Sequence, residues 1–300
     1  MKALYISSAI LLSIIAVACS HKSSDTSNES TISNFRIVQT VKSATRNYIC
    51  KGAKAFFADS LPIYSKVHLT IQWPEELGGF NIQPLQDSIM TAIYETPKTS
   101  IDETILAALD SPEGSDTYIM EEIDSIPSEE QTMTLYRDKI ASAITFSPSY
   151  IVYQIMTASY DGGAHGMTVS RFINYDFDST RVITPQLAFK AGCDETLLKA
   201  IQEQLMAMCQ VRSLNELDNY GIFSNQIFVS PEFYLQGYNI VFHYNPYDIA
   251  PYSTGSIDVP VPYYTIRECL SPEVLRLLAS TEIQGWRMRF NSNSVKNSPD

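Results

Sequence analysis

Positive charge is scarce in this sequence. The chain of 300 residues has 21 lysine and arginine residues against 33 aspartate and glutamate residues, and its formal net charge at pH 7 is −12. A nucleic-acid partner requires the opposite sign, so the composition argues against one. A cationic partner or metal ions would suit this charge. Alternatively, the surplus of acid only keeps the protein soluble.

Signatures of known catalysts are also missing. The sequence contains no Ser-His-Asp signature, no zinc-protease helix motif and no phosphate-binding glycine loop between a strand and a helix. The chain has four histidines, and its cysteines and histidines lack the close spacing of metal ligands. We therefore predict no cofactor and no metal site, and we favour a binding protein over an enzyme.

Long hydrophobic runs are absent outside the N-terminus. Ala3 to Ala18 form an apolar run broken only by serines, which is too short to span a membrane and is typical of a signal peptide at 1–18. The run ends Ala16-Val17-Ala18-Cys19, which resembles a bacterial lipobox and predicts lipidation of Cys19; an ordinary secretory signal is the alternative. The polar residues 19–33 predict a flexible tether. We expect an envelope protein anchored to a membrane by lipid, periplasmic or surface-exposed.

Cysteine is limited, beyond the predicted lipidation site, to Cys50, Cys193, Cys209 and Cys269. An even number in an oxidising compartment permits two disulfides, and buried free thiols are the alternative. A continuous helix is predicted between Cys193 and Cys209, which would hold them about 24 Å apart. A disulfide requires Cα atoms within about 7 Å, so these two cysteines are not expected to pair.

Residues 34–145 predict an N-terminal α+β subdomain. Val67 to Trp73 alternate between apolar and polar side chains, as a half-buried strand does. Helices are predicted from Pro84 and over 101–109, because apolar residues recur there at helical spacing.

The end of this first subdomain has a weaker pattern. Residues 111–128 are polar and acidic, and they predict an exposed connection. Ser128 and Gln131 have capping-box spacing, which predicts a helix that ends near Ala143.

Residues 146–285 predict a second α+β domain, followed by a polar tail at 286–300. Two strand-like runs, 150–160 and 167–175, flank a glycine-rich loop and predict a hairpin. Hairpins followed by helices indicate an α+β fold with helices packed on one face of antiparallel sheets. The remaining elements expected in this domain are a short strand at 181–184, a helix over 194–209, a second helix that begins at Ser213 and stops at Gly221, strands at 227–229, 239–244 and 259–264, and a closing helix over 271–278.

Two stretches of the second domain resemble a known family. The first is Tyr160-Asp161-Gly162-Gly163-Ala164-His165-Gly166 and the second is Gln236 to Tyr252, followed by Gly255 and Val259-Pro260-Val261-Pro262-Tyr263. In this order they resemble the RsiV-type extracytoplasmic family, domain of unknown function 3298. Its members form the outer part of lysozyme-sensing anti-sigma factors, are appended to cell-wall deacetylases, or are lipoproteins of unknown role. The resemblance implies an envelope location and a binding role. Compared with those members, this sequence shows neither a cytoplasmic portion to hold a sigma factor nor an added catalytic domain.

The candidate ligand-binding residues lie in these two stretches. Adjacent glycines allow backbone angles closed to other residues, and a loop on a rigid hairpin is a good place for recognition. We predict a site formed by the two loops, which binds a basic protein such as lysozyme or a cell-wall (peptidoglycan) glycan. Its candidate residues are Asp161, Gly162, Gly163, His165, His243, Tyr247, Asp248 and Tyr252.

Two alternatives stay open for these residues. The glycines could simply form a tight turn that His165 locks to the backbone, in a purely structural envelope lipoprotein. Alternatively, His165, His243 and an acid such as Asp248 could converge as an acid–base set in a hydrolase that acts on envelope polymers.

Overall fold

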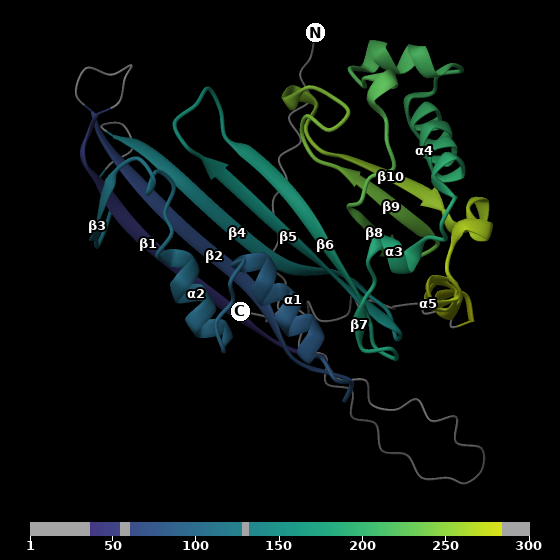
Figure 1. Cartoon of the computed structure of the whole chain (residues 1–300), viewed down its shortest axis with the longest axis horizontal. Coiled ribbons are helices and arrows are strands. Elements are labelled where there is room, and N and C mark those ends of the chain that lie inside the picture. Colours follow the sequence, from purple (N-terminus) through teal and green to yellow (C-terminus); the bar gives the residue numbers. More distant parts are fainter. Residues whose placement is uncertain (1–36, 55–60, 128–131, 284–300) are drawn as a thin grey trace, which may run out of the picture.

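The computed structural model describes residues 37–54, 61–127 and 132–283 (Figure 1). The predicted signal peptide at 1–18, the lipidation site Cys19, the tether at 19–33 and the tail at 286–300 lie outside the described residues. Among the helices of the described ranges, none combines the length and the apolar character that a membrane crossing requires.

A seven-stranded sheet forms the larger part of the fold. Its strands are β1 (Ile37–Lys54), β2 (Pro62–Leu77), β3 (Ile119–Ile123), β4 (Met133–Phe146), β5 (Tyr150–Tyr160), β6 (Met167–Asp176) and β7 (Arg181–Val182). They lie in the order β3-β1-β2-β4-β5-β6-β7. All neighbours are antiparallel except β2 and β4, which run parallel.

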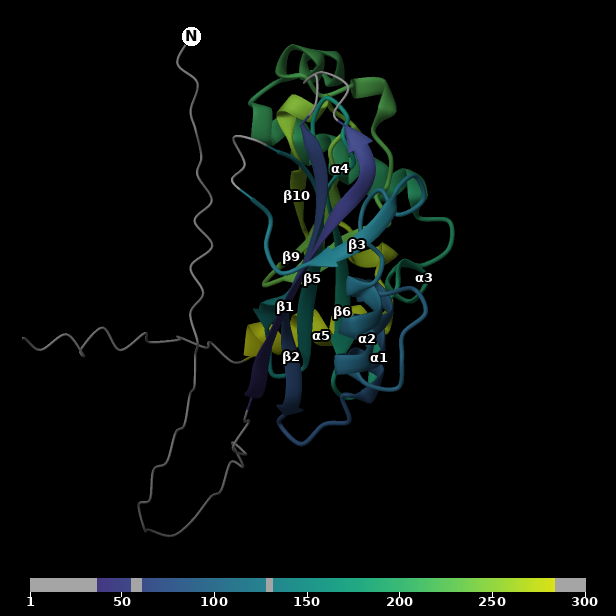
Figure 2. The same cartoon turned by 90° about the vertical axis from the view of Figure 1, so that its left-hand side faces the viewer.

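Two helices cover one face of this sheet, α1 (Gln83–Ile93) and α2 (Ile101–Leu109). Figure 2 shows both on the same side of the long strands. The apolar stripe of α1 is buried, and Ser100 caps α2 by accepting a hydrogen bond from the backbone N–H of Glu103. Both helices begin and end close to where the sequence predicts them.

A second, three-stranded sheet lies with further helices in the C-terminal half. Its strands are β8 (Phe233–Gln236), β9 (Asn239–Tyr244) and β10 (Ile257–Pro262), in the order β10-β9-β8. The α-helices here are α3 (Pro185–Ala188), α4 (Asp194–Cys209) and α5 (Pro272–Ile283). Short 3-10 helices complete this half: η2 (Leu214–Tyr220), η3 (Ser224–Gln226), η4 (Tyr252–Thr254), η5 (Tyr263–Thr265) and η6 (Arg267–Cys269).

The strand β5 belongs to two hydrophobic cores at once. Tyr150 and Val152 are buried against the small sheet and α4. Ile151, Tyr153 and Ile155 are buried on the other side, against α1 and α2. Because successive side chains of a strand point to opposite faces, one strand serves both cores. The α+β class predicted from the sequence is confirmed, with one large antiparallel-rich sheet between two covering layers.

The division predicted at 145/146 falls inside the large sheet. β4 ends at Phe146 and pairs with β5 along nearly its whole length. The two predicted subdomains therefore share a sheet, and the boundary between them is a hairpin within it.

Three predicted elements are wrong. The helix expected to end near Ala143 is the strand β4, and its start at Ser128 lies outside the described residues. The connection expected over 111–128 includes the edge strand β3, which pairs with β1. Residues 227–229 lie outside the strands of the structure, and the small sheet uses β8 at 233–236 instead.

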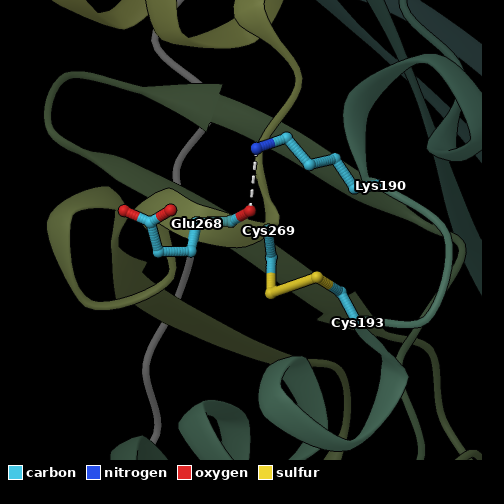
Figure 3. Close-up of a disulfide and its surroundings, with 4 residues drawn as sticks. All are labelled: Lys190, Cys193, Glu268 and Cys269. Atoms are coloured by element: carbon cyan, nitrogen blue, oxygen red, sulfur yellow. Dashed lines mark hydrogen bonds between the residues drawn. A yellow bond between two sulfur atoms is a disulfide. The ribbon is translucent and has the colours of Figure 1, made fainter.

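One disulfide is present among the described cysteines, between Cys193 and Cys269, whose Cα atoms are 5.5 Å apart (Figure 3). Beside it, the backbone N–H of Lys190 donates to the carbonyl of Cys269, and the Lys190 ammonium donates to the carbonyl of Glu268. Cys50 and Cys209 are free thiols, so the second disulfide left open by the sequence does not form. Cys50 is buried with β1 in the large sheet, whereas Cys209 ends α4.

Candidate functional site

The two loops that carry the sequence motifs meet in the structure. His165, between β5 and β6, stacks on Tyr252 of η4, with ring centroids 3.8 Å apart. Its Nε2 atom lies 3.1 Å from the hydroxyl oxygen of Tyr247, in the turn after β9. The centroids of the two tyrosine rings are 5.8 Å apart. We call His165, Tyr247 and Tyr252 the aromatic surface.

The hydrogen bonds of His165 define its neutral tautomer. Nδ1 lies 2.8 Å from the carbonyl oxygen of Gly166, which can only accept, so Nδ1 carries the proton. Nε2 is then an acceptor for the Tyr247 hydroxyl. The contact with Gly166 is the kind of hydrogen bond to the backbone that the purely structural alternative predicts for His165. The contact with Tyr247 adds a second role, because it joins the hairpin loop to the turn.

Tyr247 is held outward by the turn that contains it. Its φ angle is 75°, a left-handed value that bulky residues rarely adopt. The turn is closed by Asp248, whose carboxylate accepts the backbone N–H of Asn245 at 2.7 Å. The tyrosine side chain stays 52% exposed. Asp248 therefore shapes the loop, and Tyr247 supplies the surface that a partner can reach.

The glycine pair bends the hairpin loop over β4. Gly162 has a φ angle of 100°, and a Cβ atom there would lie 3.1 Å from the Met133 side chain of β4. Gly163 is open, with Asp161 the nearest neighbour of such a Cβ atom at 3.8 Å. Asp161 is exposed, and no contact among the described residues joins its carboxylate to the aromatic surface.

His243 is buried in a separate cluster, which reaches the surface at Asp258. Its Nδ1 is 2.7 Å from an oxygen of Asp258 on β10, and its Nε2 is 3.2 Å from Oδ1 of Asn245. That amide oxygen also accepts the backbone N–H of Ser170, which fixes its orientation. Both ring nitrogens thus face acceptor oxygens. The histidine is 3% exposed, so the cluster fastens β9 and β10 to β6.

Two further groups share this environment. Burial raises the pKa of Glu232, although the backbone N–H of Phe172 and the nearby His243 oppose the shift. Burial also raises the pKa of Tyr234, and the hydrogen-bonded Asp258 raises it further. Both shifts favour the neutral forms of side chains that hold the small sheet against β6.

An open cleft of about 440 Å³ adjoins the hairpin loop. A Cβ atom on Gly166 would lie 2.7 Å from the hydroxyl of Tyr136, which lines the cleft, so loop and cleft are in contact. The cleft lies on the face of the large sheet opposite α1 and α2. Its lining is rich in hydroxyl groups and consists of Lys66, Thr132, Thr134, Tyr136, Asp138 and Tyr160. We call it the hydroxyl cleft.

Residues 189–264 match the model of a protein family that is described as protein of unknown function (DUF3298). We call these matched residues the DUF3298 segment. The second sequence motif lies within it up to Tyr263, and the first precedes it. The predicted resemblance to DUF3298 is confirmed, whereas the RsiV-type likeness stays a prediction.

Two crystal structures of DUF3298 proteins share this fold. A family member from Bacteroides fragilis superposes with a TM-score of 0.64 at 18% identity, over 84% of this chain and 100% of its own. A family protein from Pseudomonas aeruginosa gives 0.53 at 18% identity, over 79% of this chain and 96% of its own. No curated protein matches the chain.

The structure does not bring the two histidines into one set. His165 contacts Tyr247 and Tyr252, whereas His243 contacts Asp258 and Asn245. Among the described residues, no group of three or more histidine, cysteine, aspartate or glutamate side chains is placed to hold a metal ion.

Sequence reasoning missed the partners of His243 and the hydroxyl cleft. Asp258 stands directly opposite His243 in the β9–β10 register. The predicted closing strand began at 259, so it left Asp258 out. Tyr136 was assigned to a helix, which concealed its place beside Tyr160 in the sheet, with ring centroids 6.0 Å apart.

Proposed function

We propose that this protein is a lipid-anchored extracytoplasmic binding protein that recognises a cell-wall glycan through the aromatic surface and the adjoining hydroxyl cleft. The observation that carries the proposal is the stacking of His165 on Tyr252 with Tyr247 beside them, which unites the two motif loops in one exposed feature. A flat aromatic ring offers an apolar face to the C–H side of a pyranose and a polar edge to its hydroxyls.

The hydroxyl cleft supplies the complementary polar contacts. Its volume of about 440 Å³ is in the usual range for a small-ligand site. Threonine and tyrosine hydroxyls both donate and accept, and the carboxylate of Asp138 accepts, which together match the alternating donors and acceptors of a sugar. A glycan chain would lie across the cleft with one ring on Tyr247.

The envelope location in this proposal rests on two observations. The sequence before Cys19 resembles a lipobox, and the Cys193–Cys269 disulfide is of the kind that persists in oxidising compartments.

A basic protein such as lysozyme is the second candidate ligand. The net charge of −12 favours it, and so does the resemblance to the lysozyme-sensing RsiV-type domains. We do not propose a hydrolase, because His165, His243 and Asp248 have separate partners and separate roles.

The deciding experiment is calorimetric titration of the purified protein with soluble peptidoglycan fragments and, separately, with hen lysozyme at low and physiological salt. We expect saturable binding of the glycan, weakened about five- to thirtyfold in Tyr247→Ala, because an exposed ring that stacks on a ligand contributes about 1–2 kcal/mol.

Tyr264→Ala is the matched control. Tyr264 is 68% exposed and follows the other end of β10, away from the motif loops, so its loss should leave the affinity unchanged. Saturable lysozyme binding that survives physiological salt and depends on Tyr247, with no response to glycan, would replace the glycan proposal by the second candidate.

A further inference from the structure

A second cleft lies on the opposite face of the large sheet, under the end of α1. It has a volume of about 490 Å³ and is bounded by β2, β4, β5, β6, the residues after α1 and the end of α2. Because side chains alternate along β4, Tyr136 and Asp138 line the hydroxyl cleft while Arg137 and Lys139 line this one. We call it the cationic cleft.

The cationic cleft concentrates positive charge in a protein that has little. Three of the 21 basic residues of the chain line it: Arg137, Lys139 and Arg171. Apolar side chains line its floor, where Val169 is partly exposed and Leu69 is buried beneath the surface.

Arg137 is already neutralised within the fold. Its Nε and Nη2 atoms each lie 2.6 Å from one carboxylate oxygen of Glu113, and its Nη1 donates to the carbonyl oxygen of Ser111. Its donors on both sides of the guanidinium are engaged, so it contributes shape and local potential rather than an available charge.

The Lys139 ammonium can donate one further hydrogen bond. Its ammonium donates to the carbonyl oxygens of Ala92 and Ile93 at the C-terminal end of α1, at 3.4 and 2.6 Å. An ammonium has three donors, and the hydrogen bonds among the described residues use two of them. Burial lowers the pKa of Lys139, and the neighbouring Arg137 and Arg171 lower it further, against the opposing effects of Glu95 and Glu113. Burial and the two arginines therefore outweigh the two glutamates in their effect on this ammonium.

Arg171 brings the second available cation. The cross-strand register runs from Lys139 to Thr157 and on to Val169, and Arg171 follows two residues later on β6. Arg171 is exposed. Its positive charge lowers the pKa of Glu232, which lies across the edge of β6. The rim between Lys139 and Arg171 is thus formed by two cations and the hydroxyl of Thr157.

We propose that the cationic cleft binds a small molecule with one carboxylate and an apolar body. The carboxylate would lie between the Lys139 ammonium and the Arg171 guanidinium, and the apolar body would lie on Val169, which is partly exposed. A single carboxylate suits the site better than a phosphate dianion, because Arg137 is already paired and two cations are left. The only carboxylate side chain that lines the cleft is that of Glu95, which is exposed and is the group a ligand would displace from the vicinity of Lys139.

The test is a nuclear magnetic resonance titration of the purified protein with N-acetyl-leucine and with its uncharged amide, N-acetyl-leucinamide. We expect saturable shifts at the amides of Lys139, Thr157 and Val169 with the acid, and at least tenfold weaker binding of the amide. The pKa of the Lys139 ammonium, followed through its neighbouring methylene, should rise when the acid binds.

Three variants make the outcome decisive. Arg171→Gln removes an exposed cation and should weaken the acid about five- to tenfold. Lys139→Met should abolish binding, but it also removes two hydrogen bonds to α1, so Arg171→Gln carries the test if Lys139→Met does not fold. Lys199→Gln, at an exposed lysine of α4 that lines neither cleft, is the matched control and should bind normally. Equal affinity for acid and amide, binding unchanged in Arg171→Gln, or no saturable shift at tens of millimolar ligand would each overturn the proposal.

Discussion

Gly166 stands where any side chain would collide with its surroundings. A Cβ atom there would lie 2.8 Å from the carbonyl oxygen of Ser159 and 2.7 Å from the hydroxyl of Tyr136. The tyrosine can move, but the carbonyl belongs to the backbone of β5. We expect Gly166→Ala to lower the free energy of unfolding by about 1–3 kcal/mol, as overpacking does. Urea denaturation followed by circular dichroism measures it.

Gly163→Ala is the matched control for this loop. A Cβ atom at Gly163 meets only the Asp161 carboxylate, at an ordinary 3.8 Å. We expect a change within about 0.5 kcal/mol. A loss as large as that of Gly166→Ala would mean that the contacts of Gly166 with Ser159 and Tyr136 are not the cause of its destabilisation.

Single residues also explain why β4 was predicted as a helix. Arg137 and Lys139 point toward α1 and α2, into the layer where a strand normally places apolar residues. Each is satisfied there, Arg137 by Glu113 and Lys139 by carbonyl groups of α1. Two charged residues on the covered face break the period-two pattern, and partners distant in the sequence cannot be inferred from periodicity.

At the scale of elements, a buried carboxylate fastens the end of β6 to α5. Asp176 is fully buried and accepts hydrogen bonds from Arg276 of α5 and from Ser179. Burial alone would raise the pKa of Asp176, but these bonds and the charge of Arg276 more than offset it and lower the pKa below its ordinary value. The folded state therefore binds this proton less readily than the unfolded chain does.

A lowered carboxylate pKa contributes stability above the unfolded value, near 4, and this contribution is lost as the pH falls through the folded value. We expect Asp176→Asn to cost about 2 kcal/mol at pH 7, because Arg276 is partly exposed and its attraction is screened. The difference from the unmodified protein should shrink below about pH 4. Urea unfolding across pH 2.5–7 tests this expectation.

Asp178→Asn is the control for this pH dependence. Asp178 also contacts Arg276, but its side chain is 58% exposed, so its loss should cost little at any pH. A constant deficit of Asp176→Asn at all pH values would rule out the ionisation of Asp176 as its cause.

Elements with a strong local pattern were predicted well. The stripe of α1, the bounds of α2 and the alternation of β5 each depend on neighbours in the sequence. Elements whose partners are remote were not. β3 is an exposed edge strand whose acidic residues pair with Arg46 and Lys51 of β1, so its sequence reads as a polar connection. The same holds for the candidate site. The sequence predicts which two loops form it, but the stacking of His165 on Tyr252 joins residues that are remote in the sequence.

At the scale of the whole molecule, the Cys193–Cys269 disulfide encloses most of the DUF3298 segment in one covalent loop. The sequence separation is 76 residues, for which the loss of chain entropy in the unfolded state predicts about 4 kcal/mol of stabilisation. We expect the double replacement Cys193→Ala and Cys269→Ala to lower the midpoint of thermal unfolding markedly. Reducing agent should do the same to the unmodified protein.

Cys209→Ser serves as the control, because Cys209 is a free thiol at the end of α4. Reducing agent should still destabilise this variant. If reduction leaves the unmodified protein unchanged in thermal unfolding, the disulfide does not contribute to its stability.

Because β5 belongs to both hydrophobic cores, it determines which fragments of this protein can fold. The segment recognised by the family model begins at residue 189, after β5 and β6, yet Tyr150 and Val152 of β5 complete its hydrophobic core. A fragment that contains only that segment would lack the part of its core that β5 supplies. A fragment that begins at residue 146 would keep β5, but it would expose Ile151, Tyr153 and Ile155 to water. The folding unit of this protein therefore includes the large sheet, and the segment that the family model matches is only one part of that unit.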